Sequence, residues 1–172
     1  MTEIENTAQY LRRHGLMLAT AESCTAGLIA AQLAEVPGVG DSLECAFVVY
    51  SPKAKQVCLG VSDEVLRRYN LTSVEVATAM VQGAAQRCSA SVVIANTGVA
   101  DDGGDGADAG TQCYAWLIRA SGRPERIYTE TRQFSGGRNA IRRIAAEYAL
   151  MRILHYHAQW QAQPACAAVN DT

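Results

Sequence analysis

The chain has 172 residues, of which 49% are hydrophobic and 19% are charged, and its formal net charge is −2. This length and composition fit one globular domain with a sizeable core, and no apolar run is long enough to span a bilayer. The slightly acidic balance argues against nucleic acid as the main partner. The first residues, 1–5, are polar and acidic, so we expect no secretory signal and a cytoplasmic protein.

Helix and strand signals alternate along the chain. Apolar residues at helical spacing, N-terminal capping residues and a proline at a first helical position indicate the helices. The predicted helices cover 3–14, the segment after Gly27 to about 35, a stretch beginning near 51–52, 62–69, 72–87 and 138–155. Short runs rich in Val, Ile and aromatic residues indicate the strands. The predicted strands cover 16–20, 43–50, 91–96, 112–119 and 125–134.

The order of these elements predicts the fold class. Strands alternate with helices early in the chain, and residues 121–124 then join two strands as a hairpin. This order predicts an α/β protein, a three-layer α/β/α sandwich with a mixed β-sheet. We expect a single domain over 5–157 and a frayed tail over 158–172, because that segment is polar and rich in alanine.

Lysine is rare in this sequence. The chain has thirteen arginines but only two lysines, Lys53 and Lys55. Arginine stays protonated under ordinary conditions, whereas a partly desolvated lysine can lose its proton and act as a base. The pair therefore indicates a titratable amine at one place, although codon bias toward arginine would leave the same pattern.

Ser23 lies between a predicted buried strand and the helix that follows it. A hydroxyl at this junction projects from the carboxyl edge of the sheet and faces the free N–H groups of the helix, which favour developing negative charge. A serine nucleophile that attacks an amide carbonyl would suit this place. Ser23 or Thr25 could equally be a helix cap, and Glu22 could favour the helix dipole. Glu22 and Thr25 are also candidates for contact with a substrate, since Glu22 could orient a ligand.

Two further strand ends carry polar side chains, Tyr50 and the Thr97–Gly98 pair. Ligands of open α/β sheets bind beyond the carboxyl ends of strands, so we expect these residues near Ser23. The three histidines all lie on or beside the terminal helices. A serine–histidine triad is therefore disfavoured, and a desolvated lysine is the alternative base.

The C-terminal third of the chain is basic. Residues 119–152 hold eight arginines and three glutamates, and glycines 136 and 137 precede the last helix. Arg138 and Arg142 could clamp a phosphate at that helix start, or the arginines could form a solvated helix face. The six cysteines lack zinc-site spacing, so we expect no metal.

Taken together, these segments resemble the C-terminal domain family of the competence/damage-inducible protein CinA, from about residue 5 to 155. Residues 20–27, TAESCTAG, are similar to the family's T-A-E-S-C-T-G-G. The segments at 49–51 with 54–55, 59–61, 73–77, 97–100 and 134–138 match the family's pattern in order. The match covers nearly the whole chain, which looks like the stand-alone form without the N-terminal domain of full-length relatives.

The resemblance implies a nicotinamide-nucleotide amidase, which hydrolyses nicotinamide mononucleotide to nicotinate mononucleotide and ammonia without a metal or other cofactor. It implies Ser23 as nucleophile and Lys55 or Lys53, with Tyr50, as proton-handling partners. The residues implied near the carbonyl or the phosphate of this small-molecule nucleotide are Thr97, Gly98, Gly103, Gly104, Arg138 and Arg142. The resemblance also implies a homo-oligomer, with neither membrane nor nucleic acid as a partner.

The chain departs from the family pattern around the predicted pocket. Ala26 replaces a glycine, and aspartates 101 and 102 replace Gly-Pro in the loop. Carboxylates near a phosphate would repel it unless they face solvent or hold a cation. The altered loop fits an amidase with a changed substrate range, and two alternatives to that interpretation stay open. One is a paralogue that keeps the fold but binds a ligand or partner without turnover. The other is a metal-dependent hydrolase built on Asp101, Asp102 and Asp105.

Overall fold

The computed structural model describes residues 1–101 and 106–164, and in this part of the chain five strands form one mixed sheet. The strand order is β2-β1-β3-β4-β5. The strands are β1 (Leu18–Glu22), β2 (Leu43–Val48), β3 (Val92–Gly98), β4 (Thr111–Ala120) and β5 (Arg123–Gln133). β1 pairs in parallel with β2 and β3, whereas β4 is antiparallel to both β3 and β5. The mixed sheet expected from the late hairpin is thereby confirmed.

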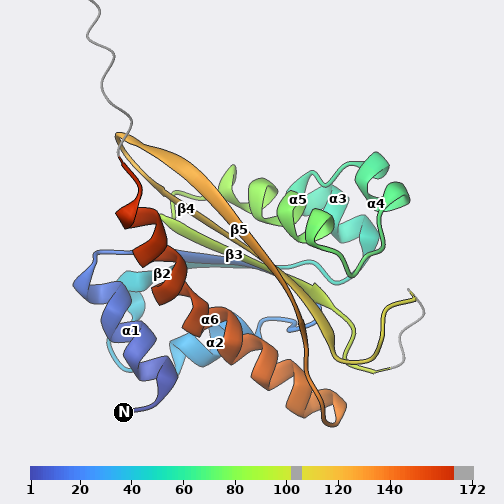
Figure 1. Cartoon of the computed structure of the whole chain (residues 1–172), viewed down its shortest axis with the longest axis horizontal. Helices are drawn as coiled ribbons and strands as arrows, with labels where there is room; N and C mark the ends of the chain where they lie inside the picture. The colour runs from blue at the N-terminus through green and yellow to red at the C-terminus, as the bar shows by residue number, and fades with distance from the viewer. Residues whose placement is uncertain (102–105, 165–172) are drawn as a thin grey trace, which may run out of the picture.

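Helices cover both faces of this sheet, which gives the predicted three-layer sandwich (Figure 1). The first face carries α1 (Glu3–Arg13), α2 (Leu28–Ala34) and α6 (Arg138–Ala162), and the other carries α3 (Pro52–Leu59), α4 (Asp63–Arg68) and α5 (Val74–Ala85). A short 3₁₀ turn at Gly40–Ser42 precedes β2. Alternate residues of the central strands point to opposite layers. Leu18, Ile94 and Trp116 therefore pack in the first core, and Ala19, Val93 and Leu117 pack in the second.

Some element boundaries differ from the sequence-based prediction. The helix predicted over 72–87 begins at Val74 instead, because the Ser73 hydroxyl caps α5 by accepting from the Val76 amide. α6 runs past the predicted end at His155 to Ala162, because Trp160 is buried and its indole donates to the Pro124 carbonyl. Residues 158–162 of the predicted tail are therefore helical. No helix in the described ranges is long and apolar enough to cross a bilayer.

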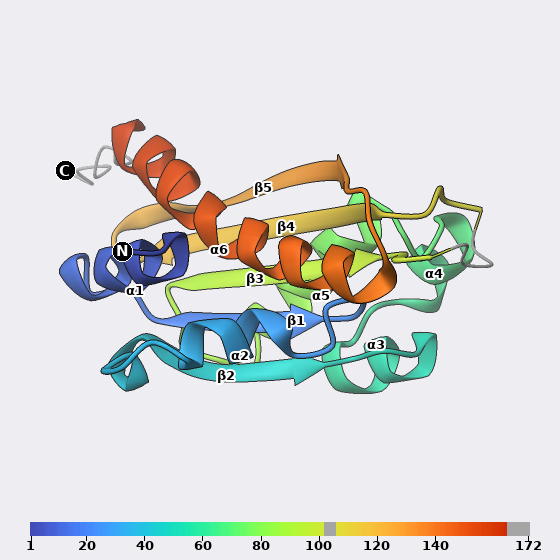
Figure 2. The same ribbon diagram turned by 90° about the horizontal axis from the view of Figure 1, so that it is seen from below.

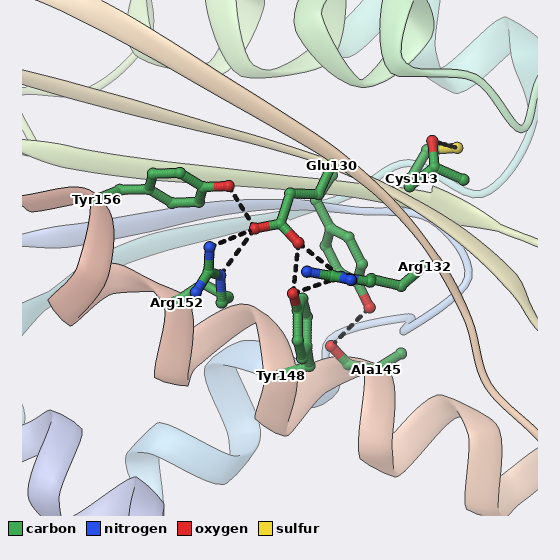
Figure 3. A network of polar contacts seen from close by, with 9 residues as sticks. Cys113, Glu130, Arg132, Ala145, Tyr148, Arg152 and Tyr156 are labelled. Atoms are coloured by element: carbon green, nitrogen blue, oxygen red, sulfur yellow. Dashed lines mark hydrogen bonds and ion pairs between the residues drawn. The ribbon is translucent and has the colours of Figure 1, made fainter. Parts of the chain in front are cut away.

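A partly buried carboxylate fixes α6 against the outer strand β5. Glu130 of β5 accepts from the hydroxyls of Tyr148 and Tyr156 and from the guanidinium groups of Arg132 and Arg152, both of which approach to 2.7 Å (Figure 3). Burial alone would raise the pKa of Glu130, but these hydrogen bonds outweigh it and lower the pKa to about 2. The network holds the helix whose first turns carry Arg138 and Arg142.

Replacing Glu130 by glutamine is expected to lower the free energy of unfolding at pH 7 by about 3 kcal/mol, the equivalent of the shift in pKa. Because the folded-state pKa is depressed, this stabilisation is present above about pH 4.5 and disappears as the pH falls toward 2. Urea unfolding of both proteins across this range measures the difference. The control is Glu125→Gln, an exposed residue on the same strand, which should change stability by less than about 0.5 kcal/mol. Equal losses in the two variants would contradict the role of the network.

Candidate active site

The carboxyl ends of β1, β2 and β3 and the start of α6 meet at one end of the sheet (Figure 2). Ser23 follows β1 directly at this edge, and its side chain is almost fully buried. Its backbone amide donates to the Asn96 carbonyl on β3 at 2.9 Å, which extends the parallel pairing by one residue. The sheet itself therefore fixes the position of the Ser23 backbone.

Lys55 reaches Ser23 from the helix that follows β2. The Lys55 Nζ lies 2.9 Å from Ser23 Oγ, and it also lies 3.1 Å from the Val49 carbonyl oxygen and 3.2 Å from that of Tyr50. Lys55 is only 1% exposed. The expected hydrogen bond between Ser23 and a lysine amine is therefore present in the structure.

Helix geometry decides between the two lysines. Ser51 caps α3 by accepting from the Ala54 amide, and Pro52 occupies the first turn. Residues two positions apart on a helix are separated by about 200°, so Lys53 and Lys55 point to opposite sides. Lys53 is exposed to solvent. The alternative assignment of Lys53 as the proton-handling lysine is therefore wrong.

Burial changes the protonation of the Lys55 amine. Removing the ammonium from water lowers the pKa of Lys55 from 10.5 to about 8. A neutral amine has two N–H donors and one lone pair, whereas an ammonium has three donors. The two carbonyl oxygens of Val49 and Tyr50 match the two donors, so the lone pair of the neutral amine can face the Ser23 hydroxyl. The surroundings are thus suited to a lysine that accepts a proton from serine.

Glu22 organises the turn that carries Ser23. It is fully buried, and its two oxygens accept from five donors, which leaves the carboxylate no room for a ligand. The donors are the hydroxyls of Thr20 and Thr25 and the amides of Gly27, Ile29 and Ala30. The prediction that Glu22 and Thr25 contact substrate is therefore wrong, because each satisfies the other inside the protein.

The start of α2 is likewise closed to a ligand. Glu22 accepts from three amides at this helix start, so the expectation that Ser23 faces free helix N–H groups is also wrong. Among the amides from Ser23 to Ala30, only that of Cys24 has no acceptor within the described residues. The Cys24 amide is therefore the donor at this turn that a ligand oxygen could use.

A pocket of about 260 Å³ opens above Ser23 and Lys55. It is lined by Ser23, Cys24, Tyr50, Lys55, Leu71, Thr72, Thr97, Gly98 and Val99. The pocket brings together the three strand ends that the sequence singled out. The Thr97 hydroxyl, however, donates to the Leu71 carbonyl at 2.8 Å, so it is not free to hold an oxyanion as expected. Gly103 and Gly104 lie outside the described residues.

A buried amide pair below the pocket was not predicted from the sequence. Asn96 accepts from the Thr25 amide and donates to Gln112, which in turn donates to the Cys24 sulfur and the Val99 carbonyl. The Gln112 side chain crosses Gly98 so closely that an added Cβ there would lie 2.5 Å from it. The signal in the sequence was a glutamine at the start of an otherwise apolar strand, which requires buried polar partners.

The outer rim of the pocket holds an ion pair. Arg138, at the start of α6, lies 2.6 Å from the Asp101 carboxylate and donates to the Tyr50 hydroxyl at 3.1 Å. Arg142, one turn further along, donates to the carbonyls of Cys24 and Thr25. The predicted phosphate clamp is therefore wrong for Arg142, which fastens the serine turn. The Tyr50 hydroxyl bonds to Arg138, and the contact from Tyr50 to Lys55 is through its backbone carbonyl.

Most of the remaining basic residues of the C-terminal third hold the fold together. Arg119 donates to three backbone carbonyls around Cys88, and Arg123 donates to three near the end of α6. Arg132 and Arg152 likewise bind Glu130, although Arg132 itself is half exposed. The guanidinium groups of these four arginines already have partners within the protein, so the expectation of a basic ligand surface is wrong for them.

Ala26 adopts a left-handed backbone, with φ of +50°. This conformation costs an L-residue other than glycine about 1 kcal/mol, which explains why the family pattern has glycine here. Ala26 does not line the pocket. The added methyl group therefore strains the turn without blocking a ligand.

The acidic residues of the loop do not form a metal site in the part that the structure describes. Across residues 1–101 and 106–164, no group of three or more His, Cys, Asp or Glu side chains is arranged to hold a metal ion. Asp101 is paired with Arg138, and Asp102 and Asp105 lie outside the described residues.

These observations define the class: an α/β/α protein with a serine–lysine pocket at the carboxyl edge of a mixed sheet. The family model described as CinA C-terminal domain matches residues 2–157, and the chain belongs to this family. It is 39% identical over 143 residues to a CinA-like protein of Syntrophobacter fumaroxidans, covering 82% of this chain and 32% of that protein. A CinA-like protein of Akkermansia muciniphila is 37% identical over 147 residues, covering 84% and 34%. The chain thus spans about a third of the length of these curated relatives.

Solved structures of the family share the whole fold. A competence-damaged protein (CinA) superfamily protein from Klebsiella pneumoniae matches with a TM-score of 0.85 and 30% identity, covering 92% of this chain and 97% of that one. A CinA superfamily protein from Escherichia coli matches with a TM-score of 0.80 and 35% identity, covering 89% and 90%. The α/β/α architecture is therefore that of the CinA superfamily.

Proposed function

We propose that this protein is a serine–lysine amidohydrolase acting on the carboxamide of a nicotinamide nucleotide, with nicotinamide mononucleotide as the first substrate to test. The observation that carries the proposal is the buried Lys55 amine 2.9 Å from Ser23 Oγ, in a pocket at the carboxyl edge of the sheet. The likeness to the CinA family supplies the substrate class.

In the first half-reaction, neutral Lys55 takes the proton of Ser23, and Ser23 Oγ attacks the carboxamide carbon. In this proposal the oxyanion accepts a hydrogen bond from the Cys24 amide, which has no acceptor among the described residues. Collapse of the tetrahedral intermediate breaks the C–N bond, and the Lys55 ammonium returns the proton so that ammonia leaves. Water then attacks the ester on Ser23, with Lys55 again accepting a proton, and the acid is released as Ser23 regains its hydrogen.

Cys24 is the other nucleophilic side chain in the pocket, but its surroundings argue against it. Burial raises the pKa of Cys24, so the thiol stays protonated at neutral pH. Its sulfur already accepts from Gln112 at 3.3 Å. Ser23, with a base in direct contact, is the better nucleophile.

The proposal is tested by measuring ammonia release from nicotinamide mononucleotide with and without EDTA. Steady turnover that EDTA leaves unchanged is the expected result. An absence of turnover by folded protein would contradict the proposal and favour a ligand-binding paralogue. Turnover that requires added Mg²⁺ would favour the metal-dependent alternative.

A further inference from the structure

Arg138 lies at the rim of the pocket, half exposed to solvent, and forms an ion pair with Asp101 of the same chain. Its side chain is 47% exposed and that of Asp101 is 58% exposed, with 2.6 Å between the guanidinium and the carboxylate. The other end of the same guanidinium contacts the hydroxyl of Tyr50, which lines the pocket. Arg138 and Asp101 also act electrostatically on Cys24, which places both charges close to the nucleophile turn.

Two other cations at this edge already bind partners inside the protein. Arg142 donates from Nε and Nη2 to the backbone carbonyls of the serine turn, and Lys55 is buried against Ser23. Lys53 is also exposed at this edge, but among the described residues Arg138 is the solvent-accessible cation that hydrogen-bonds a side chain lining the pocket, the Tyr50 hydroxyl. An anionic substrate group can therefore approach Arg138 from solvent. A guanidinium binds a carboxylate and a phosphate through the same planar set of donors. Asp101 thus occupies on Arg138 the place that a substrate phosphate would take.

We propose that Asp101 is a specificity-determining residue that competes with a substrate phosphate for Arg138. A phosphate-bearing amide must displace Asp101 and then lie beside its negative charge, whereas a phosphate-free carboxamide binds without disturbing the ion pair. Asp101 therefore shifts the preference of this pocket from nucleotides toward phosphate-free nicotinamide derivatives. The inference rests on the proposed function for the class of substrate.

The test compares two ligands that differ by one phosphate, nicotinamide mononucleotide and nicotinamide riboside. Calorimetry on the Ser23→Ala protein, with and without Asp101→Asn, measures binding without turnover. Asp101→Asn should tighten binding of the mononucleotide by about tenfold, because one like charge near the phosphate is removed and Arg138 is released. Both ligands carry the same cationic ring, so any effect of Asp101 on the ring is common to both. The affinity for the riboside, which has no phosphate, should therefore change much less.

Two further variants make the outcome specific to the ion pair. Asp108→Asn removes an exposed charge from the same loop that forms no ion pair with Arg138 in the described structure, and it should leave the ratio of the two affinities unchanged. Adding Arg138→Ala to Asp101→Asn should cancel most of the gain for the mononucleotide. Equal changes for both ligands, or the same gain from Asp108→Asn, would overturn the inference.

These outcomes separate the inference from the proposed function. A shifted affinity ratio in a protein whose wild type releases no ammonia would refute the amidase and keep Asp101 as the specificity residue. Ammonia release with an unchanged ratio would keep the amidase and refute the role of Asp101.

Discussion

Replacing Ser23 by alanine is expected to lower kcat for ammonia release by roughly 10⁶-fold, as removal of the nucleophile does in serine hydrolases. The reason is that the Cys24 thiol beside it is held protonated by burial and cannot take over. The structure should persist, because the Ser23 amide rather than its side chain pairs with β3. Steady-state assays of both proteins at saturating substrate measure the loss.

Ser121→Ala is the matched control for this variant. Ser121 is an exposed serine in the turn between β4 and β5, at the end of the sheet away from the pocket. Its kcat should stay within about twofold of the wild type, because surface substitutions of this kind change little. Ammonia release that survives in Ser23→Ala would show that another group attacks the amide.

Replacing Lys55 by methionine is expected to lower kcat/KM by about 10³-fold, within the range for loss of a general base. Lys55→Arg should lose as much, because a guanidinium stays protonated and cannot accept the Ser23 proton. The two variants together separate the base from the positive charge. Activity retained in Lys55→Arg would mean that charge alone is required.

The same variants are expected to behave differently in stability. The lowered pKa shows that the buried amine is held at an energetic cost below pH 8, where the folded and unfolded states both carry the proton. Lys55→Met removes that cost but leaves the Val49 and Tyr50 carbonyls without their donor. We expect the relief of the buried charge to offset the two lost hydrogen bonds. Thermal unfolding at pH 7 should then give a Tm no lower than that of the wild type. Lys53→Met, at an exposed site two residues away, should retain both activity and Tm.

The fold and the serine–lysine contact could be predicted from the sequence, because they follow from local patterns. Alternating strands and helices place the carboxyl ends of parallel strands at one edge of the sheet. The order of the elements is therefore enough to predict that Ser23 and Tyr50 lie close together. The three-layer sandwich is confirmed by the sheet and by the solved CinA structures. The rarity of lysine drew attention to Lys53 and Lys55 together. Their positions on α3 then distinguish them, because Lys55 points toward Ser23 and Lys53 points to solvent.

The roles of the other polar residues could not be predicted, because they depend on which partner each one finds in space. The sequence suggests that Glu22 binds a ligand, but in the structure its carboxylate accepts from five donors within the protein. Arg142 has the position of a phosphate clamp, but its donors turn inward to carbonyls. Gln112 gave almost no signal, since its partners Asn96 and Cys24 are 16 and 88 residues away.

A buried, neutral amine that takes the serine proton is the central claim, and the pH dependence of kcat/KM for ammonia release tests it most directly. Because Lys55 must be unprotonated, the rate should rise about tenfold per pH unit below its pKa of about 8 and level off above it. A rate constant that stays flat from pH 6 to pH 9, or that keeps the same inflection in Lys55→Met, would contradict the account.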